Sequence, residues 1–122
     1  MMKCVDLNRL LIKNFPQLQQ EYSEQISWQD GENTGAHVVY GDVFNPYLIE
    51  IISNSQKNEM QTAFDFVEQM LMLDDEYAEN VMCVTVLESV AHIFRDDPRL
   101  FEHLGEKSAK LMHEIFEYLY RT

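Results

Sequence analysis

The sequence has few of the residues that make tight turns and cross-links. Its 122 residues include four glycines, three prolines and two cysteines. A β-sandwich or β-barrel needs a turn about every 8–12 residues, so this content argues against both. Cys4 and Cys83 are too few and too far apart for a disulfide framework or a cysteine metal cluster. Their use therefore favours a reducing compartment.

The sequence also lacks a long apolar run. Its first residues, MMKCVDLNRLLIKNF, mix charged and apolar side chains, unlike a signal peptide. No stretch approaches the roughly 18 apolar residues that a membrane-spanning helix needs. We therefore expect a cytoplasmic protein that does not enter a membrane. The length and the 46% hydrophobic content predict one helical domain over residues 1–122.

Basic residues are scarce. The chain has 21 acidic and 9 basic residues, a net charge of −12, and residues 37–104 hold thirteen of the acids but three of the bases. Such a surface disfavours nucleic acid and anionic lipid and attracts a basic protein. The same charge is also typical of an acidic protein whose charge serves only to keep it soluble.

Helical spacing of apolar residues recurs along most of the chain. The clearest case places apolar side chains on one face at Met60, Ala63, Phe64, Val67, Met70 and Leu71. Further helices are expected at about 3–14, from Pro16 to about Ile26, at about 75–94, and at the C-terminus. We predict an all-α fold of six or seven helices, stacked as antiparallel hairpins in a short α-solenoid-like bundle around the 75–94 helix.

The stretch HVVYGDVFNPYLIEII, at 37–52, combines polar and apolar residues. It contains strand-forming residues, but no second segment could pair with it, so we interpret it as helical. A helix ending near Phe44 would be followed by Asn45 as the N-cap of the next helix, with Pro46 at its first position. Asp97 before Pro98 predicts a second cap, and Gly105 a helix C-terminus.

The motifs that could carry chemistry are incomplete. HEIFE at 113–117 lacks the second histidine of a zinc-binding helix, and we expect no metal and no cofactor. Cys83 lies in the apolar run VMCVTVL, which is typical of a packed thiol. Glu88 and His92, four residues apart, are either an intrahelical pair or a general base with the residue that orients it.

Tyrosines beside carboxylates are the remaining candidates for a site. Asp42 and Tyr47 lie near the expected helix join, and Asp74, Asp75, Glu76 and Glu79 lie at the start of the 75–94 helix. An aromatic ring next to acids suits recognition of a basic protein surface. Rings that pack the join and acids that cap helices explain the same residues equally well.

Three segments carry a resemblance to a known family: YGDVFNPYL at 40–48, DEYAENVMCVTVLE at 75–88 and the FPQL segment at 15–18. The chain resembles a family of small helical bacterial proteins of unassigned activity. That family is similar to immunity proteins of toxin–immunity loci, including contact-dependent growth inhibition systems. The resemblance implies an immunity role and supplies no catalytic residue.

The leading hypothesis is a non-enzymatic immunity protein that binds and neutralises a basic toxin, such as a nuclease domain. Its expected binding residues are Asp42, Tyr47, Asp74, Asp75, Glu76 and Glu79. The alternatives are a helical scaffold without a toxin partner and a small enzyme that uses Glu88 and His92. A protein that mimics DNA is a weaker alternative.

Overall fold

The computed structural model describes residues 1–121, and helices are its only regular secondary structure over that range. Six continuous helices and one separate 3₁₀ helix confirm the all-α prediction of six or seven helices. Their segments are α1 (Cys4–Asn14), the 3₁₀ turn Pro16–Leu18 with α2 (Gln19–Ser27), α3 (Ala36–Val39) with α4 (Asn45–Ser53), α5 (Lys57–Leu71), α6 (Glu76–Asn80) with α7 (Glu88–Asp96), the 3₁₀ helix Pro98–His103, and α8 (Glu106–Leu119). A short 3₁₀ turn, Gly31–Asn33, lies between α2 and α3.

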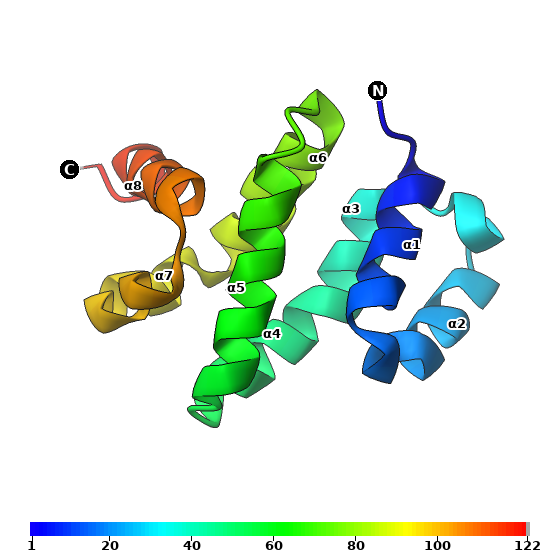
Figure 1. Cartoon of the computed structure of the whole chain (residues 1–122), viewed down its shortest axis with the longest axis horizontal. Helices are drawn as coiled ribbons and strands as arrows, with labels where there is room; N and C mark the ends of the chain where they lie inside the picture. The colour runs from blue at the N-terminus through cyan, green and yellow to red at the C-terminus, as the bar shows by residue number, and fades with distance from the viewer. Residues whose placement is uncertain (122) are drawn as a thin grey trace.

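The segments follow one another across the molecule, from α1 and α2 at one end to α8 at the other, with α5 near the middle (Figure 1). The helix that contains α6 and α7 is the most deeply buried, as the prediction of a central helix required. Its fully enclosed side chains are Ala78, Val81, Met82, Val86, Leu87, Val90, Ala91 and Phe94. Burial of these apolar groups is the main favourable term for the fold.

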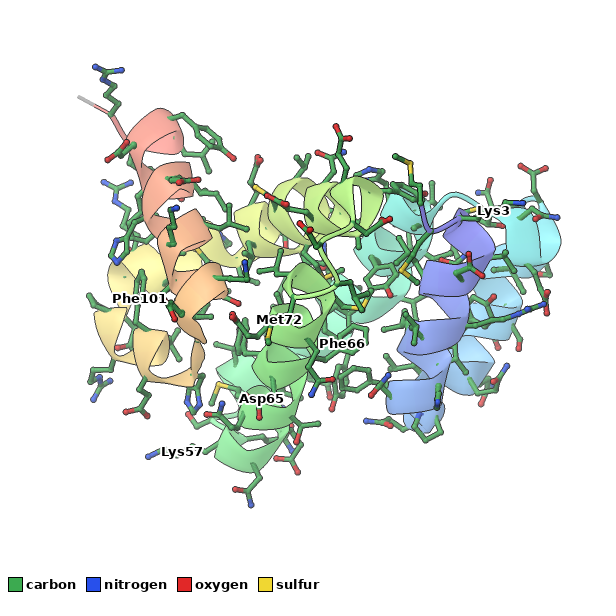
Figure 2. The ribbon with its side chains drawn as sticks, turned by 45° about the horizontal axis from the view of Figure 1, so that its top comes forward. Lys3, Lys57, Asp65, Phe66, Met72 and Phe101 are labelled. Carbon is green, nitrogen blue, oxygen red and sulfur yellow. The ribbon has the colours of Figure 1, made fainter. Side chains whose placement is uncertain are left out.

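An aromatic cluster joins α5 to the N-terminal helices. Phe66 points from α5 toward α1 in Figure 2, and its ring lies 5.2 Å from that of Phe15 and 5.9 Å from that of Phe44, centre to centre. Tyr40 packs against the same ring, and its hydroxyl donates to the Leu7 carbonyl at 2.6 Å. These contacts fix α1 and the 36–53 helix on one side of α5.

The join between α3 and α4 differs from the prediction. No helix ends at Phe44, and Asn45 does not cap one, because the π-helical segment Tyr40–Phe44 carries a single helix from Ala36 to Ser53. The Asn45 amide donates to the carbonyl of Tyr40, five residues earlier. The wider turn accommodates Pro46, which has no N–H to donate and would clash with the carbonyl four residues before it in a regular α-helix.

A second π-helical segment, Val81–Leu87, joins α6 to α7 and packs against the first. The Asn45 side-chain amide donates to the Thr85 carbonyl at 2.9 Å, and the Thr85 hydroxyl is hydrogen-bonded to Nδ1 of His37. Gly41 faces the same crossing, where a Cβ would lie 3.6 Å from the Thr85 methyl group, an ordinary van der Waals contact. The polar residues of the 37–52 stretch therefore connect two crossing helices.

The N-terminus of α8 is capped by a residue of another helix. The Glu68 carboxylate of α5 accepts hydrogen bonds from the Lys107 amide at 3.0 Å, the Ser108 amide at 2.9 Å and the Ser108 hydroxyl at 2.6 Å. Gly105 directly follows Leu104, the C-cap of the 3₁₀ helix Pro98–His103, as predicted, and it also precedes α8. A Cβ at Gly105 would come within 2.4 Å of the Glu68 side chain. The Asp97 carboxylate accepts from the Arg99 amide, as its predicted cap role requires.

Replacing Asn45 with alanine should lower the free energy of unfolding by about 1–3 kcal/mol, because it leaves the Thr85 carbonyl without its partner in a buried crossing. Urea unfolding followed by circular dichroism measures this difference. Asn58→Ala, on the exposed first turn of α5, is the matched control and should change stability little. Equal stability of the Asn45 variant and the wild type would show that the hydrogen bond does not hold the crossing.

Glu68→Gln should destabilise the protein by about 1–2 kcal/mol at pH 7, the usual worth of a helix cap. Burial raises the pKa of Glu68, but the hydrogen bonds from Ser108 and Lys107 outweigh it and hold this pKa below its ordinary value of 4.5. The stabilisation is therefore present above pH 4.5 and is lost as the pH falls through the lowered pKa. Urea unfolding of both proteins across this range should show the difference shrinking in acid, whereas a constant difference would contradict the cap.

Candidate functional site

The six predicted binding residues fall into two groups, and two of them contact the N-terminal helices. The Asp42 carboxylate accepts a hydrogen bond from the Gln25 side chain at 2.9 Å. The Tyr47 hydroxyl accepts from Gln17 at 3.2 Å, and its ring packs against Phe15. Both residues therefore have contacts within the chain, and no hydrogen bond among the described residues links them to the acids at 74–79.

Asp75 also has a structural task. Its carboxylate caps α6 by accepting from the Ala78 amide at 3.0 Å, and it accepts from the Met2 amide at 2.8 Å. These two bonds, that of Ala78 first, lower the pKa of Asp75. The prediction that an acid at 74–76 caps the central helix is confirmed at this residue.

Asp74, Glu76 and Glu79 are exposed to solvent. Within residues 1–121, none of the three forms an ion pair. Asp74 has a positive φ of 54° in the turn after α5, and the neighbouring side chains of Met72 and Leu73 are also exposed. These three acids, unlike Asp42 and Asp75, are therefore free to meet a partner.

Two further acids, neither of them among the predicted binding residues, lie beside this group. Glu88 of α7 and Glu114 of α8 lie, with Glu79, close enough to the Cys83 thiol to raise its pKa. The Tyr118 hydroxyl of α8 donates to the Glu88 carboxylate at 2.6 Å. The acids of two helices thus converge on one surface, which we call the acidic face: Glu76, Glu79, Glu88 and Glu114 with Val84 and Tyr118.

The acidic face combines charge with accessible apolar surface. Val84 is 49% exposed and Tyr118 is 55% exposed. Lys107 and Lys110 border the face and line a shallow hollow with Glu79 and Glu114, but neither forms an ion pair in the described structure. Glu114 and Tyr118 are four residues apart, so their spacing in the sequence places them on one side of α8. That spacing does not indicate which helix α8 packs against.

Glu88 and His92 have separate surroundings. Glu88 accepts from Tyr118 on the acidic face, while His92, about one turn further along α7, lines a groove with the α4–α5 turn. No hydrogen bond or ion pair joins the two residues in the part of the chain that the structure describes. The pairing of a general base with the residue that orients it, considered from the sequence, is therefore not formed.

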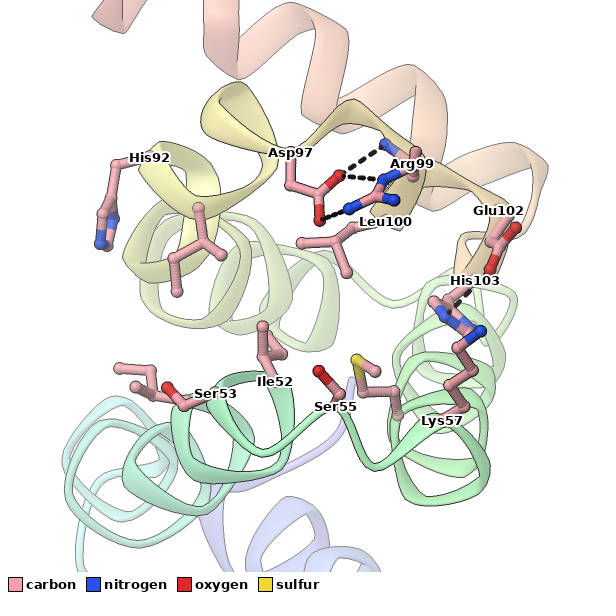
Figure 3. Close-up of a pocket in the computed structure, with 13 residues that line it drawn as sticks. Ile52, Ser53, Ser55, Lys57, His92, Asp97, Arg99, Leu100, Glu102 and His103 are labelled. Carbon is pink, nitrogen blue, oxygen red and sulfur yellow. Dashed lines mark hydrogen bonds and ion pairs between the residues drawn. The ribbon is translucent and has the colours of Figure 1, made fainter.

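The groove has a volume of about 820 Å³ and lies between the α4–α5 turn and the 3₁₀ helix Pro98–His103 (Figure 3). Its apolar surface is aliphatic and comes from Ile49, Ile52, Met60, Ile93 and Leu100. Its polar border carries Ser53, Ser55, Lys57, His92, Asp97, Arg99, Glu102 and His103. The sequence does not predict this groove, because the groove forms between segments that are about 40 residues apart in the chain.

Most charged groups at the groove are paired with one another. The Asp97 carboxylate accepts from Nε of Arg99 at 2.9 Å, and Glu102 lies 3.6 Å from Nε2 of His103. His103 is buried, and its Nδ1 is hydrogen-bonded to the Gln61 side chain at 2.8 Å. Lys57, which points away from α5 in Figure 2, has no ion pair among the described residues.

Within residues 1–121, no group of three or more His, Cys, Asp and Glu side chains is arranged to hold a metal ion. None of the helices in that range has the length and apolar character to span a membrane.

The surroundings of Cys83 predict that its thiol is alkylated slowly. Partial burial raises the pKa of this thiol above its ordinary value of 9.0; the Tyr118 hydrogen bond opposes this shift and the surrounding carboxylates add to it. In a Cys4→Ser background, the pH at half-maximal alkylation by iodoacetamide should therefore lie above 9.0, since the thiolate is the nucleophile. Glu79→Gln with Glu114→Gln should move this midpoint down toward 9.0.

The control for that experiment is Glu21→Gln with Glu24→Gln, which changes the net charge equally on α2. It should leave the midpoint in place. The same midpoint in both double variants would contradict the convergence of the two acids on Cys83.

Comparison with known proteins identifies one family. Neither the curated proteins nor the solved structures gave a match. Residues 8–120, nearly the whole chain, match the family described as "Domain of unknown function (DUF7674)". The protein therefore belongs to the DUF7674 family.

Proposed function

We propose that this protein is a non-enzymatic binding protein that holds a basic protein partner on its acidic face. The observation that carries the proposal is the convergence of Glu79, Glu88 and Glu114, from two packed helices, beside the exposed side chains of Val84 and Tyr118. Acids on a rigid surface with a half-exposed tyrosine suit a partner that presents Lys or Arg beside apolar groups.

The charge distribution supports the same proposal. Residues 58–94 contain eight Asp and Glu residues and neither Lys nor Arg, and this stretch includes most of the acidic face. Charges of one sign on one side of a protein speed the approach of an oppositely charged partner, and the apolar residues then slow its release. The tyrosine is the expected anchor, because aromatic residues dominate the energy of many interfaces.

The partner that we propose is a toxin domain, most concretely a nuclease that the protein neutralises by covering its substrate surface. Nucleases bind a polyanion and therefore carry basic surfaces. A compact acidic protein competes directly for such a surface. The resemblance to immunity proteins of toxin–immunity loci supports this choice of partner.

The first experiment is purification of the tagged protein from its source cells at low salt, with identification of the proteins bound to it. We expect a stoichiometric basic partner whose nuclease activity falls when the protein is added back. A partner without toxic activity would support the binding role and contradict the immunity role. The absence of any basic partner would favour a helical scaffold whose charge serves only to keep it dissolved.

Changing Glu76, Glu79 and Glu114 together to Gln should weaken binding of the basic partner by at least about tenfold at low salt, and should flatten the salt dependence of the affinity. Isothermal titration calorimetry at two salt concentrations measures both effects. Asp75 is left unchanged, because it caps α6.

The matched control changes Glu21, Glu24 and Glu50 to Gln, which gives the same net charge on other exposed surfaces. Its affinity should stay close to that of the wild type. Equal losses in the two triple variants would mean that net charge, and not the acidic face, attracts the partner.

A further inference from the structure

The aliphatic groove is an unusual part of the protein surface, because its lining includes two of the few cationic residues in the acidic middle of the chain. Between residues 37 and 104 the chain has three Lys and Arg residues, Lys57, Arg95 and Arg99, and two of them line the groove. Arg95 is turned toward the C-terminus, where its guanidinium lies 4.3 Å from the centre of the Tyr120 ring. The groove therefore differs in charge from the acidic face.

The two cations and the two carboxylates of the groove are equal in number, but they are not all paired. Asp97 is paired with Arg99, and Glu102 lies beside the imidazole of His103. Lys57 stands at the same end as His103 in Figure 3, and its ammonium group has no such partner within residues 1–121. An unpaired ammonium group therefore stands at one end of an apolar channel.

The polar groups near Lys57 and the shape of the floor define the complementary ligand. The Arg99 guanidinium, whose fork would suit a phosphate, is already engaged by Asp97 through two of its nitrogens. Lys57 and the Ser55 hydroxyl remain as donors, which fits a monoanion. The floor contains branched aliphatic side chains and a methionine, and no aromatic ring on which a base or indole could stack.

We propose that this groove binds a free aliphatic carboxylate, with the carboxylate at Lys57 and the hydrocarbon chain over Ile52, Ile93 and Leu100. The volume of about 820 Å³ falls within the usual range for a site that takes a small molecule. This site is independent of the basic partner proposed above, because it lies on a different surface and offers an unpaired ammonium group to a ligand.

Titration of the full chain with dodecanoate, below its micelle concentration, tests the proposal by calorimetry and by amide shifts in ¹H–¹⁵N spectra. We expect one saturable site, with shifts centred on the α4–α5 turn and on residues 98–103. Affinity should rise by about twofold for each methylene added from octanoate to dodecanoate. This corresponds to about half of the binding free energy expected for full burial of a methylene in a closed site. Dodecanol should bind at least about tenfold more weakly.

Lys57→Gln should weaken dodecanoate binding by at least about tenfold and leave dodecanol binding unchanged. Lys110→Gln removes the same charge from exposed α8, outside the groove, and should bind dodecanoate as the wild type does. Ile49→Ser, a change at a partly exposed position that spares the core, should weaken both ligands.

Three results would overturn the proposal. The first is the lack of saturable dodecanoate binding by the folded wild type. The second is equal dodecanoate affinity in the Lys57 and Lys110 variants. The third is a set of amide shifts centred on another surface, such as the acidic face.

Discussion

The crossing of two long helices at their π-helical segments is the constraint on which the rest of the structure depends. Each segment disturbs the regular pattern of backbone hydrogen bonds, and a buried carbonyl without a donor is costly. The Asn45 side chain supplies the donor for the Thr85 carbonyl. This contact sets the direction of the central helix, which in turn positions α8 on one of its sides and α5 on another.

The acidic residues divide into those that hold the fold and those that remain available. Glu68 and Asp75 each accept backbone N–H groups at the start of a helix, which explains the acidic character of these positions without any partner. Glu76 and Glu79 make no comparable bond within the described chain. A high net charge alone therefore does not identify a binding surface, and the distinction needs the hydrogen-bond partner of each carboxylate.

Local pattern predicted the helices, while long-range contacts decided what the polar residues do. Apolar spacing correctly indicated α1, α5 and the central helix, because burial of one face follows from sequence spacing. The same reasoning failed at Asn45-Pro46, where a cap motif lies inside a helix that a π-helical turn keeps continuous. It also missed Glu114 and the groove, since both depend on how segments distant in sequence pack together.

The two surfaces described here differ in local charge, and the fold keeps them apart. The central helix contributes to both: its first half presents Glu76 and Glu79, and its last turns present His92 and Ile93 to the groove. A basic partner on the acidic face would gain little from the groove, where Lys57 would repel it. An anionic ligand has the reverse preference. Because one rigid helix carries both surfaces, each can be altered by exposed substitutions without disturbing the other, which makes their functions separable.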